Sequence, residues 1–346
     1  MINLRKGALR RALCGVLPAA LLLTGLAGCG QSAEPAAQDT AATAAVTQAE
    51  ATPAVNDAIA AAAEGIEEDP SLPQQITYNG ADYVLNKDLS TLLFLGIDSE
   101  AIAEDRQVVG SGGRADTIMI FVLNKTDKTL RVLELSRDTM TSVDVYNANR
   151  KFLYSGTMQI DMQYAFGEST ARSCALMKNK VSEVLEDLRI NSICSLTVEG
   201  LVSVVDAMGG LTLTLDYDYT DIDPAYTAGA TITMNGEEAE HFIRYRDITT
   251  SGSNDTRMQR HTDLMLELFS TIASYGKVKL TSLYEAAGDQ LYTDLTADEL
   301  AALSEYTLTE VIKIPGETQH GDLHDEYYLD TDAVHELIVQ TFYLPA

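Results

Sequence analysis

The chain has 346 residues, and its 51 acidic side chains outnumber its 24 lysines and arginines, giving a formal net charge of −27 at pH 7. A protein this acidic repels the phosphate backbone of nucleic acids, so the charge argues against a nucleic-acid partner and makes any local cluster of arginines informative. The sequence has no tryptophan, and no Cys-x-x-Cys or histidine-rich spacing of the kind that holds zinc.

The N-terminal residues have the pattern of a secretory signal. Basic residues precede an apolar run over 12–26, and Leu26-Ala27-Gly28-Cys29 has the spacing of a bacterial lipobox. We therefore expect residues 1–29 to be a lipoprotein signal peptide, with Cys29 carrying the lipid that anchors the protein at the extracytoplasmic face of the cell membrane. The alternative is a spanning helix, but the run is shorter than the roughly 20 apolar residues that a bilayer needs.

The rest of the chain divides by composition. Residues 30–75 are rich in alanine, threonine, glutamine and proline and contain no aromatic side chain, so we expect a disordered tether. Residues 76–346 are long enough for one catalytic domain, with core motifs over 92–274 and a helical, tyrosine-rich completion over 276–346. Cys174 and Cys194 lie in this domain, where a disulfide and two buried free thiols are equal alternatives.

Three apolar runs predict strands that meet at one edge of a sheet. The run 91–95 ends at Asp98, and the runs 117–123 and 130–135 flank a turn-rich connector of hairpin length. Folding the hairpin about Thr126 places Asp116 opposite Ser136 and therefore close to Arg137. If the first strand runs alongside, its end brings Asp98 to the same edge.

Downstream, the periodicity alternates between helix and strand. We expect helices over 171–188, 201–208 and about 256–275, the last capped by Asn254 or Asp255, and strands over 192–198, 211–215 and 241–246. Further helical stretches are expected over 283–291 and 297–303. The fold class is α/β, a three-layer α-β-α sandwich around a mixed central β-sheet.

The candidate site residues are those a pyrophosphate requires, namely hard carboxylate oxygens for a divalent cation and guanidinium groups for phosphate oxygens. Arg244 and Arg246 are two apart on an expected strand and would share a face, while Arg257 and His261 are four apart on an expected helix. Taken singly, each is more commonly a solvated or salt-bridging side chain. The full candidate set is Asp98, Arg114, Asp116, Arg137, Arg244, Arg246, Arg257 and His261.

The order of the motifs resembles the LytR-CpsA-Psr family. The matching segments are Leu95-Gly96-Ile97-Asp98, Arg114-Ala115-Asp116-Thr117, Ser136-Arg137-Asp138, Val205-Asp206-Ala207-Met208-Gly209-Gly210, Met234-Asn235-Gly236, Arg244-Tyr245-Arg246 and Asp255-Thr256-Arg257-Met258-Gln259-Arg260. The resemblance implies that Asp98 and Asp116 hold Mg²⁺ or Mn²⁺ at a polyprenyl pyrophosphate. It implies that the arginines at 114, 137, 244, 246 and 257 bind the phosphate oxygens.

The chain departs from the family pattern at two points. His261 stands where the family has a neutral glutamine, so a group that can titrate enters the site. Asp161 stands in Ile160-Asp161-Met162-Gln163-Tyr164 where many members have asparagine, which puts the acceptor side in doubt. Neither departure removes an expected metal ligand or arginine.

The expected function is a metal-dependent transferase of phosphorus-containing groups, which moves a cell-wall glycopolymer from a polyprenyl pyrophosphate carrier to peptidoglycan. Carboxylates, arginines and a metal suit phosphoryl transfer, because this reaction needs positioning and electrostatic stabilisation more than a nucleophilic side chain. One alternative is a hydrolase that cleaves the same pyrophosphate with water. A second is a lipoprotein that binds polyprenyl or wall polymer without turnover.

Overall fold

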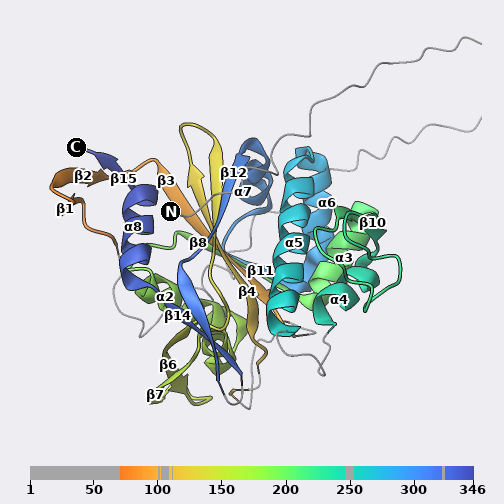
Figure 1. The fold of residues 1–346 in the computed structure, drawn as a ribbon, viewed down its shortest axis with the longest axis horizontal. Coiled ribbons are helices and arrows are strands. Elements are labelled where there is room, and N and C mark those ends of the chain that lie inside the picture. Colours follow the sequence, from red (N-terminus) through yellow and green to blue (C-terminus); the bar gives the residue numbers. More distant parts are fainter. Residues whose placement is uncertain (1–70, 100–101, 103–108, 111, 246–252, 322–323) are drawn as a thin grey trace, which may run out of the picture. The chain divides into compact units, whose positions relative to one another are not determined.

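A six-stranded mixed sheet forms the centre of the fold in the computed structural model (Figure 1), which describes residues 71–99, 102, 109–110, 112–245, 253–321 and 324–346 and omits the side chains of 253–256 and 258. The strand order is β11-β8-β3-β4-β5-β12. Strand β3 pairs antiparallel with β4 and parallel with β8, and β5 pairs parallel with β12. The strands are β3 (Leu89–Ile97), β4 (Ala115–Asn124), β5 (Thr129–Glu134), β8 (Ser192–Thr197), β11 (Leu291–Thr293) and β12 (Thr307–Lys313).

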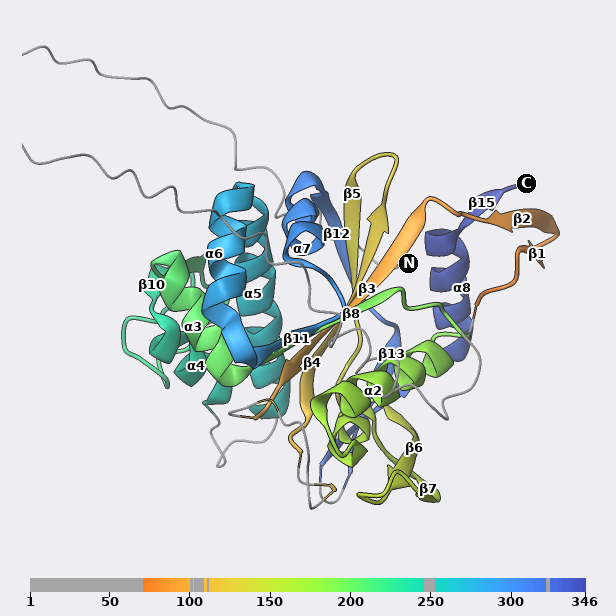
Figure 2. The same cartoon turned by 180° about the vertical axis from the view of Figure 1, so that it is seen from behind.

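Helices cover both faces of this sheet, which explains its continuous apolar runs. Along β3, Leu93 and Leu95 point to one helical layer, whereas Leu92 and Phe94 point to the other. Figures 1 and 2 show α2 (Thr170–Val184) and α8 (Thr331–Phe342) on one side of the sheet. The opposite layer holds α3 (Val198–Met208), α4 (Gly236–Arg244), α5 (Ser253–Ala273), α6 (Lys277–Ala287) and α7 (Ala297–Ala302). The expected three-layer sandwich is confirmed.

Smaller strand pairs and 3-10 turns complete the domain. Strands β6 (Met140–Tyr146) and β7 (Phe152–Gln159) form an antiparallel ribbon that leads into the 3-10 helix η1 (Ile160–Phe166). The other elements are β1 (Gln75–Tyr78), β2 (Ala81–Leu85), β9 (Leu211–Thr214), β10 (Thr231–Met234), β13 (Gly316–His320), β14 (Asp325–Leu329), β15 (Tyr343–Pro345), η2 (Gly288–Gln290) and η3 (Leu303–Glu305).

Several expected elements are confirmed, with small shifts at their ends. The β4–β5 hairpin forms, but it pairs Met119 with Glu134, one residue from the expected register, because Asn124 pairs with Thr129 across a four-residue turn. Helix α3 ends where expected, at Met208, and is capped by Gly209, whose φ of +89° is the left-handed conformation that glycine adopts without strain. Helix α6 begins at Lys277, before the expected stretch, and ends at Ala287.

The strand expected over 241–246 is wrong, because residues up to Arg244 belong to helix α4. This helix begins with a capping box. The Asn235 side chain accepts from the Glu238 backbone N–H, and the Glu238 carboxylate accepts from that of Asn235. The Asn-x-x-Glu spacing was the signal that could have predicted the helix.

The packed domain also begins earlier than the expected boundary at residue 76. Leu72 is buried in the core and β1 starts at Gln75, so the last residues assigned to the tether belong to the fold. Cys174 and Cys194 are both buried and are not joined by a disulfide, so of the two alternatives the structure has the two thiols. Within the described residues, every helix is too short or too polar to cross a bilayer. The signal peptide, Cys29 and residues 30–70 lie outside the described part of the chain.

Candidate functional site

The ends of β3 and β4 bring two carboxylates to the same edge of the sheet. Strand β3 ends at Ile97, and the backbone N–H of Asp98 donates to the carbonyl of Arg114 at 2.9 Å, just before β4 begins. A register shift after Gly96 lies at this end of the ladder. Antiparallel pairing therefore places Asp98 beside the start of β4, where Asp116 is the second residue.

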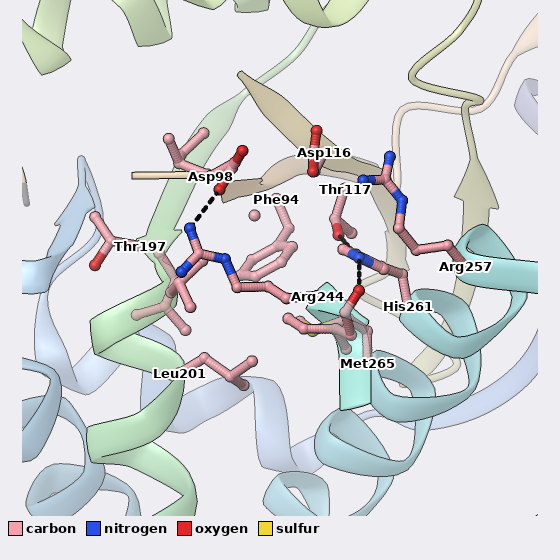
Figure 3. Close-up of a pocket in the computed structure, with 15 residues that line it drawn as sticks. Phe94, Asp98, Asp116, Thr117, Thr197, Leu201, Arg244, Arg257, His261 and Met265 are labelled. Carbon is pink, nitrogen blue, oxygen red and sulfur yellow. Dashed lines mark hydrogen bonds and ion pairs between the residues drawn. The ribbon is translucent and has the colours of Figure 1, made fainter. Parts of the chain in front are cut away.

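A cavity of about 180 Å³ opens beside these strand ends (Figure 3). Asp98 and Arg244 lie on one side of it, and Asp116, Arg257 and His261 lie on the other (Figure 3). Five of the candidate residues, from four separate segments of the chain, thus surround one space, with apolar side chains below them. The lining residues are Phe94, Gly96, Ile97, Asp98, Asp116, Thr117, Leu196, Thr197, Val198, Leu201, Ile243, Arg244, Arg257, His261 and Met265.

Arg244 reaches this cavity from the last residue of α4. Its Nη2 atom donates to Asp98 Oδ1 at 3.0 Å, and its Nη1 atom donates to Glu240 Oε1 at 2.9 Å, one helical turn earlier. Because Arg244 ends a helix, the expected sharing of one strand face with Arg246 is wrong. Arg246 itself lies outside the described residues, and its role stays a prediction.

Arg137 lies between three carboxylates. Its guanidinium donates to Asp116, its Nε atom is 3.4 Å from Asp138 Oδ1, and its Nη1 atom is 3.8 Å from Asp161 Oδ2. The predicted proximity of Asp116 and Arg137 is confirmed. Arg137 lines a second small cleft with Asp116 and His261, whereas Arg114 lines neither space.

Asp161 lies next to the site, although it was not among the candidate residues predicted from the sequence. Its side chain is completely inaccessible, and its Oδ2 atom lies 3.7 Å from Arg114 Nη1. Burial raises the pKa of this carboxyl to about 7, although Arg137 and Arg114 pull the pKa down. The only signal in the sequence was its departure from the family asparagine.

His261 is held in its neutral form. Its Nε2 atom lies 3.0 Å from the carbonyl oxygen of Ile243, and its Nδ1 atom lies 3.4 Å from Thr117 Oγ1. A carbonyl only accepts, so Nε2 carries the proton and donates it to Ile243. Burial lowers the pKa of His261 to about 4. In this arrangement the ring has no proton to offer a phosphate, and it forms part of the cavity wall.

A second, apolar cavity of about 170 Å³ lies between the sheet and helices α5, α6 and α7. Phe94 and Leu196 line both cavities, so the two spaces adjoin at β3 and β8. The other lining residues are Leu92, Phe121, Leu123, Leu130, Cys194, Val204, Leu268, Phe269, Ile272, Ala273, Leu280, Leu283, Tyr284, Ala287, Leu291, Leu300, Ala301, Leu303 and Ser304.

The charged cavity at the strand ends is found in a chain whose sequence matches a known family. A sequence model of the LytR_cpsA_psr family matches residues 48–341. The chain belongs to this family. The match extends over every element that contributes to the two cavities of this LytR_cpsA_psr member.

Relatives with curated names include one from Bacillus cereus (strain AH820), named polyisoprenyl-teichoic acid–peptidoglycan teichoic acid transferase TagU. It is 25% identical over 274 residues, which cover 76% of this chain and 81% of the relative. Among solved structures, Bacillus subtilis TagU aligns with a TM-score of 0.53 and 20% identity over 73% of this chain and 95% of its own. The structure of TagT bound to LI-WTA aligns with a TM-score of 0.56 and 19% identity, over 80% of this chain and 96% of its own. These two structures share the fold.

Proposed function

We propose that this LytR_cpsA_psr member transfers an anionic cell-wall glycopolymer of the teichoic-acid class from a polyprenyl pyrophosphate carrier to peptidoglycan. The observation that carries the proposal is the pair of adjoining cavities, one lined by carboxylates and arginines and the other almost entirely apolar. A lipid-linked pyrophosphate has the same two parts. Membership of the family and the name of the Bacillus cereus relative support the same activity.

The charged cavity suits a pyrophosphate with a divalent cation. Asp98 and Asp116 both line it, but among the described residues no three His, Cys, Asp or Glu side chains gather as a metal site. The remaining ligands would then be phosphate oxygens and water, which is how Mg²⁺ is usually held beside phosphates. We propose Mg²⁺ or Mn²⁺ at Asp98 and Asp116, where the ion would neutralise charge on the transferring and leaving phosphates.

The apolar cavity suits the polyprenyl chain. Its wall contains Phe94, Phe121 and Phe269, whose rings pack edge to face with centroids 4.7–6.4 Å apart. Burying isoprenoid surface here would contribute about 25 cal/mol for each Å² removed from water. Because Phe94 also lines the charged cavity, a carrier could place its pyrophosphate at the carboxylates while its first isoprene units enter the apolar space.

In the proposed transfer, a sugar hydroxyl of peptidoglycan attacks the phosphorus bonded to the glycopolymer. The new oxygen–phosphorus bond forms as the phosphoanhydride bond breaks, and polyprenyl phosphate leaves with the bridging oxygen. Arg244 and Arg257 line the cavity and would stabilise charge on these phosphates. Asp98, whose side chain is 45% exposed, or a neighbouring carboxylate would take the hydroxyl proton. His261 is a weaker candidate for the base, because its Nδ1 atom lies 3.4 Å from the Thr117 hydroxyl.

Incubating the full-length chain in detergent with a labelled lipid-pyrophosphate glycan and peptidoglycan fragments tests the proposal. We expect label on peptidoglycan in the presence of Mg²⁺ and none without it. Release of free glycan phosphate without wall labelling would instead identify a pyrophosphate hydrolase. Carrier binding that is equal with and without metal, with no product, would identify a binding lipoprotein. For localisation, we propose anchoring through lipid on Cys29; a labelled fatty acid should be incorporated into the wild-type chain and not into Cys29→Ser.

A further inference from the structure

Asp161 is a buried carboxylate to which no residue in the described part of the chain donates a hydrogen bond. Its side chain has no exposed surface, and neither of its oxygen atoms has a hydrogen-bond partner among the described residues. An ionised carboxylate in such a place is strongly disfavoured unless opposite charges lie close to it. The charged groups around Asp161 therefore determine its charge and its effect on the site.

The backbone fixes Asp161 next to the segment that carries Arg137. The N–H of Ile160 donates to the carbonyl of Thr139 at 2.8 Å, and the N–H of Asp161 donates to that of Arg137 at 3.3 Å. The Gln159 side chain donates to Asp138 Oδ1 at 2.6 Å. Three successive residues at the start of η1 thus hold the carboxylate in place, and its position does not depend on the ion pairs themselves.

Two guanidinium groups share one oxygen of this carboxylate. Asp161 Oδ2 is 3.7 Å from Arg114 Nη1 and 3.8 Å from Arg137 Nη1. These separations are too long for hydrogen bonds, so the carboxylate does not orient either guanidinium directly. They are short enough for electrostatic attraction, which is stronger at Arg137, where the side chain is 12% exposed, than at the 45% exposed and solvent-screened Arg114. Asp116 and Asp138 also lie against Arg137, so three carboxylates act on this one guanidinium, and of the three Asp161 also pairs with Arg114.

We infer that Asp161 is a positioning residue that acts through Arg137, whose cleft shares Asp116 and His261 with the charged cavity, offsetting its positive charge and so competing with the incoming pyrophosphate for it. The inference rests on the proposed function for the identity of the substrate. A carrier pyrophosphate that reaches Arg137 meets a guanidinium that is already partly neutralised, and it binds less tightly than it would to the same guanidinium without Asp161.

The test compares Asp161→Asn with wild type in full-length protein at pH 8 and saturating Mg²⁺. The substitution keeps the shape of the side chain and removes its charge. Transfer kinetics with a short-chain lipid-pyrophosphate glycan should give a KM about three- to tenfold lower, with kcat within about twofold, because ground-state and transition-state binding are strengthened together. Binding of geranyl pyrophosphate, measured by calorimetry, should tighten by the same factor.

Two further variants separate charge from structure. Asp161→Glu keeps the negative charge and should return KM toward the wild-type value. Asp294 is another carboxyl whose pKa is raised by burial; it accepts from the Ile193 backbone N–H at 2.8 Å, away from these arginines. Asp294→Asn should therefore leave KM and geranyl pyrophosphate affinity as in wild type. Thermal unfolding of each variant reports on folding independently.

The outcomes are distinct. An unchanged or raised KM in Asp161→Asn would overturn the inference, because the carboxylate would then either have no effect on substrate binding or strengthen it. If wild type transfers nothing but binds geranyl pyrophosphate, and the variant binds it more tightly, the proposed function fails while the role of Asp161 stands. If neither protein binds geranyl pyrophosphate, no anion competes with Asp161 for Arg137, and the inference fails too.

Discussion

Arg244 Nη2 lies 3.0 Å from Asp98 Oδ1, which joins the last residue of helix α4 to the residue that follows strand β3. Both side chains are 45% exposed. The pair spans 146 positions in the sequence and lies at the mouth of the charged cavity. In the free protein Arg244 thus neutralises a proposed metal ligand, and binding of the cation with its pyrophosphate would require the guanidinium to turn toward the phosphates.

Arg244→Ala should lower the transfer rate by about 10²-fold, because it removes a cation that faces the developing phosphate charge. The free energy of unfolding should change by no more than about 1 kcal/mol, because the ion pair is half exposed and screened by solvent. Transfer assays and urea unfolding measure the two effects. Lys128→Ala, which breaks the exposed ion pair with Glu305 at 3.1 Å, is the matched control and should retain full activity. A wild-type rate in Arg244→Ala would exclude Arg244 from the site.

Chelating divalent cations should abolish transfer, and Mg²⁺ should restore it. Asp116→Asn should raise the Mg²⁺ concentration for half-maximal activity by at least about tenfold, because a neutral amide is a poorer ligand than a carboxylate. A Mg²⁺ titration of the transfer rate measures this. Asp127→Asn, on the exposed turn of the β4–β5 hairpin, should titrate like wild type. Full activity in the presence of chelator would rule out the proposed metal.

His261 should make the fold less stable in acid. Its pKa falls from an ordinary 6.5 to about 4 on folding, so between these pH values the unfolded chain binds a proton that the folded chain does not. The stability contribution is complete above pH 6.5 and is lost as pH falls toward 4. Urea unfolding at pH 7.5 and 4.5 should show a smaller loss for His261→Gln than for wild type. His241→Gln, on the exposed surface of α4, should behave as wild type; equal losses in all three proteins would contradict this assignment.

Ala273→Trp should discriminate between carriers of different length. Ala273 lines the apolar cavity from the end of α5 and is only partly buried, so an indole can occupy the cavity without overfilling the core. KM for a long polyprenyl carrier should rise about tenfold, whereas KM for a short-chain analogue should change little. Ala302→Trp places the same side chain on the exposed end of α7 and serves as control. Equal effects on both carriers would show that the cavity does not hold the lipid.

The sequence was most informative where several levels of pattern agreed. The apolar run before Asp98 and the hairpin that carries Asp116 and Arg137 predicted one sheet edge, and the one-residue error in register did not separate these groups. Strand burial on two faces and a short turn leave few ways to pair such segments. The central sandwich was predictable for the same reason.

The predictions were wrong or incomplete where a helix cap or a packing contact between distant segments determines the structure. The segment before Arg244 has the apolar pattern of a strand, but the capping box at Asn235 and Glu238 starts a helix there. The burial of Asp161 could not be derived, since it depends on how η1 packs against residues from a different hairpin. Strand β12 completes the sheet by pairing with β5, and helix α8 packs on one face of the sheet. Both contacts join segments far apart in the sequence, and hydrophobic periodicity does not reveal such contacts.

Phe94 forms part of the wall of both cavities, with Leu196 beside it on the neighbouring strand. A substitution at this single position therefore alters two chemically different surfaces together. Selection for a carrier with another isoprenoid geometry would also reshape the space next to Asp98, and compensating changes at the strand ends would have to follow. At the proposed carrier site, specificity for the lipid and reactivity at phosphorus would therefore change together.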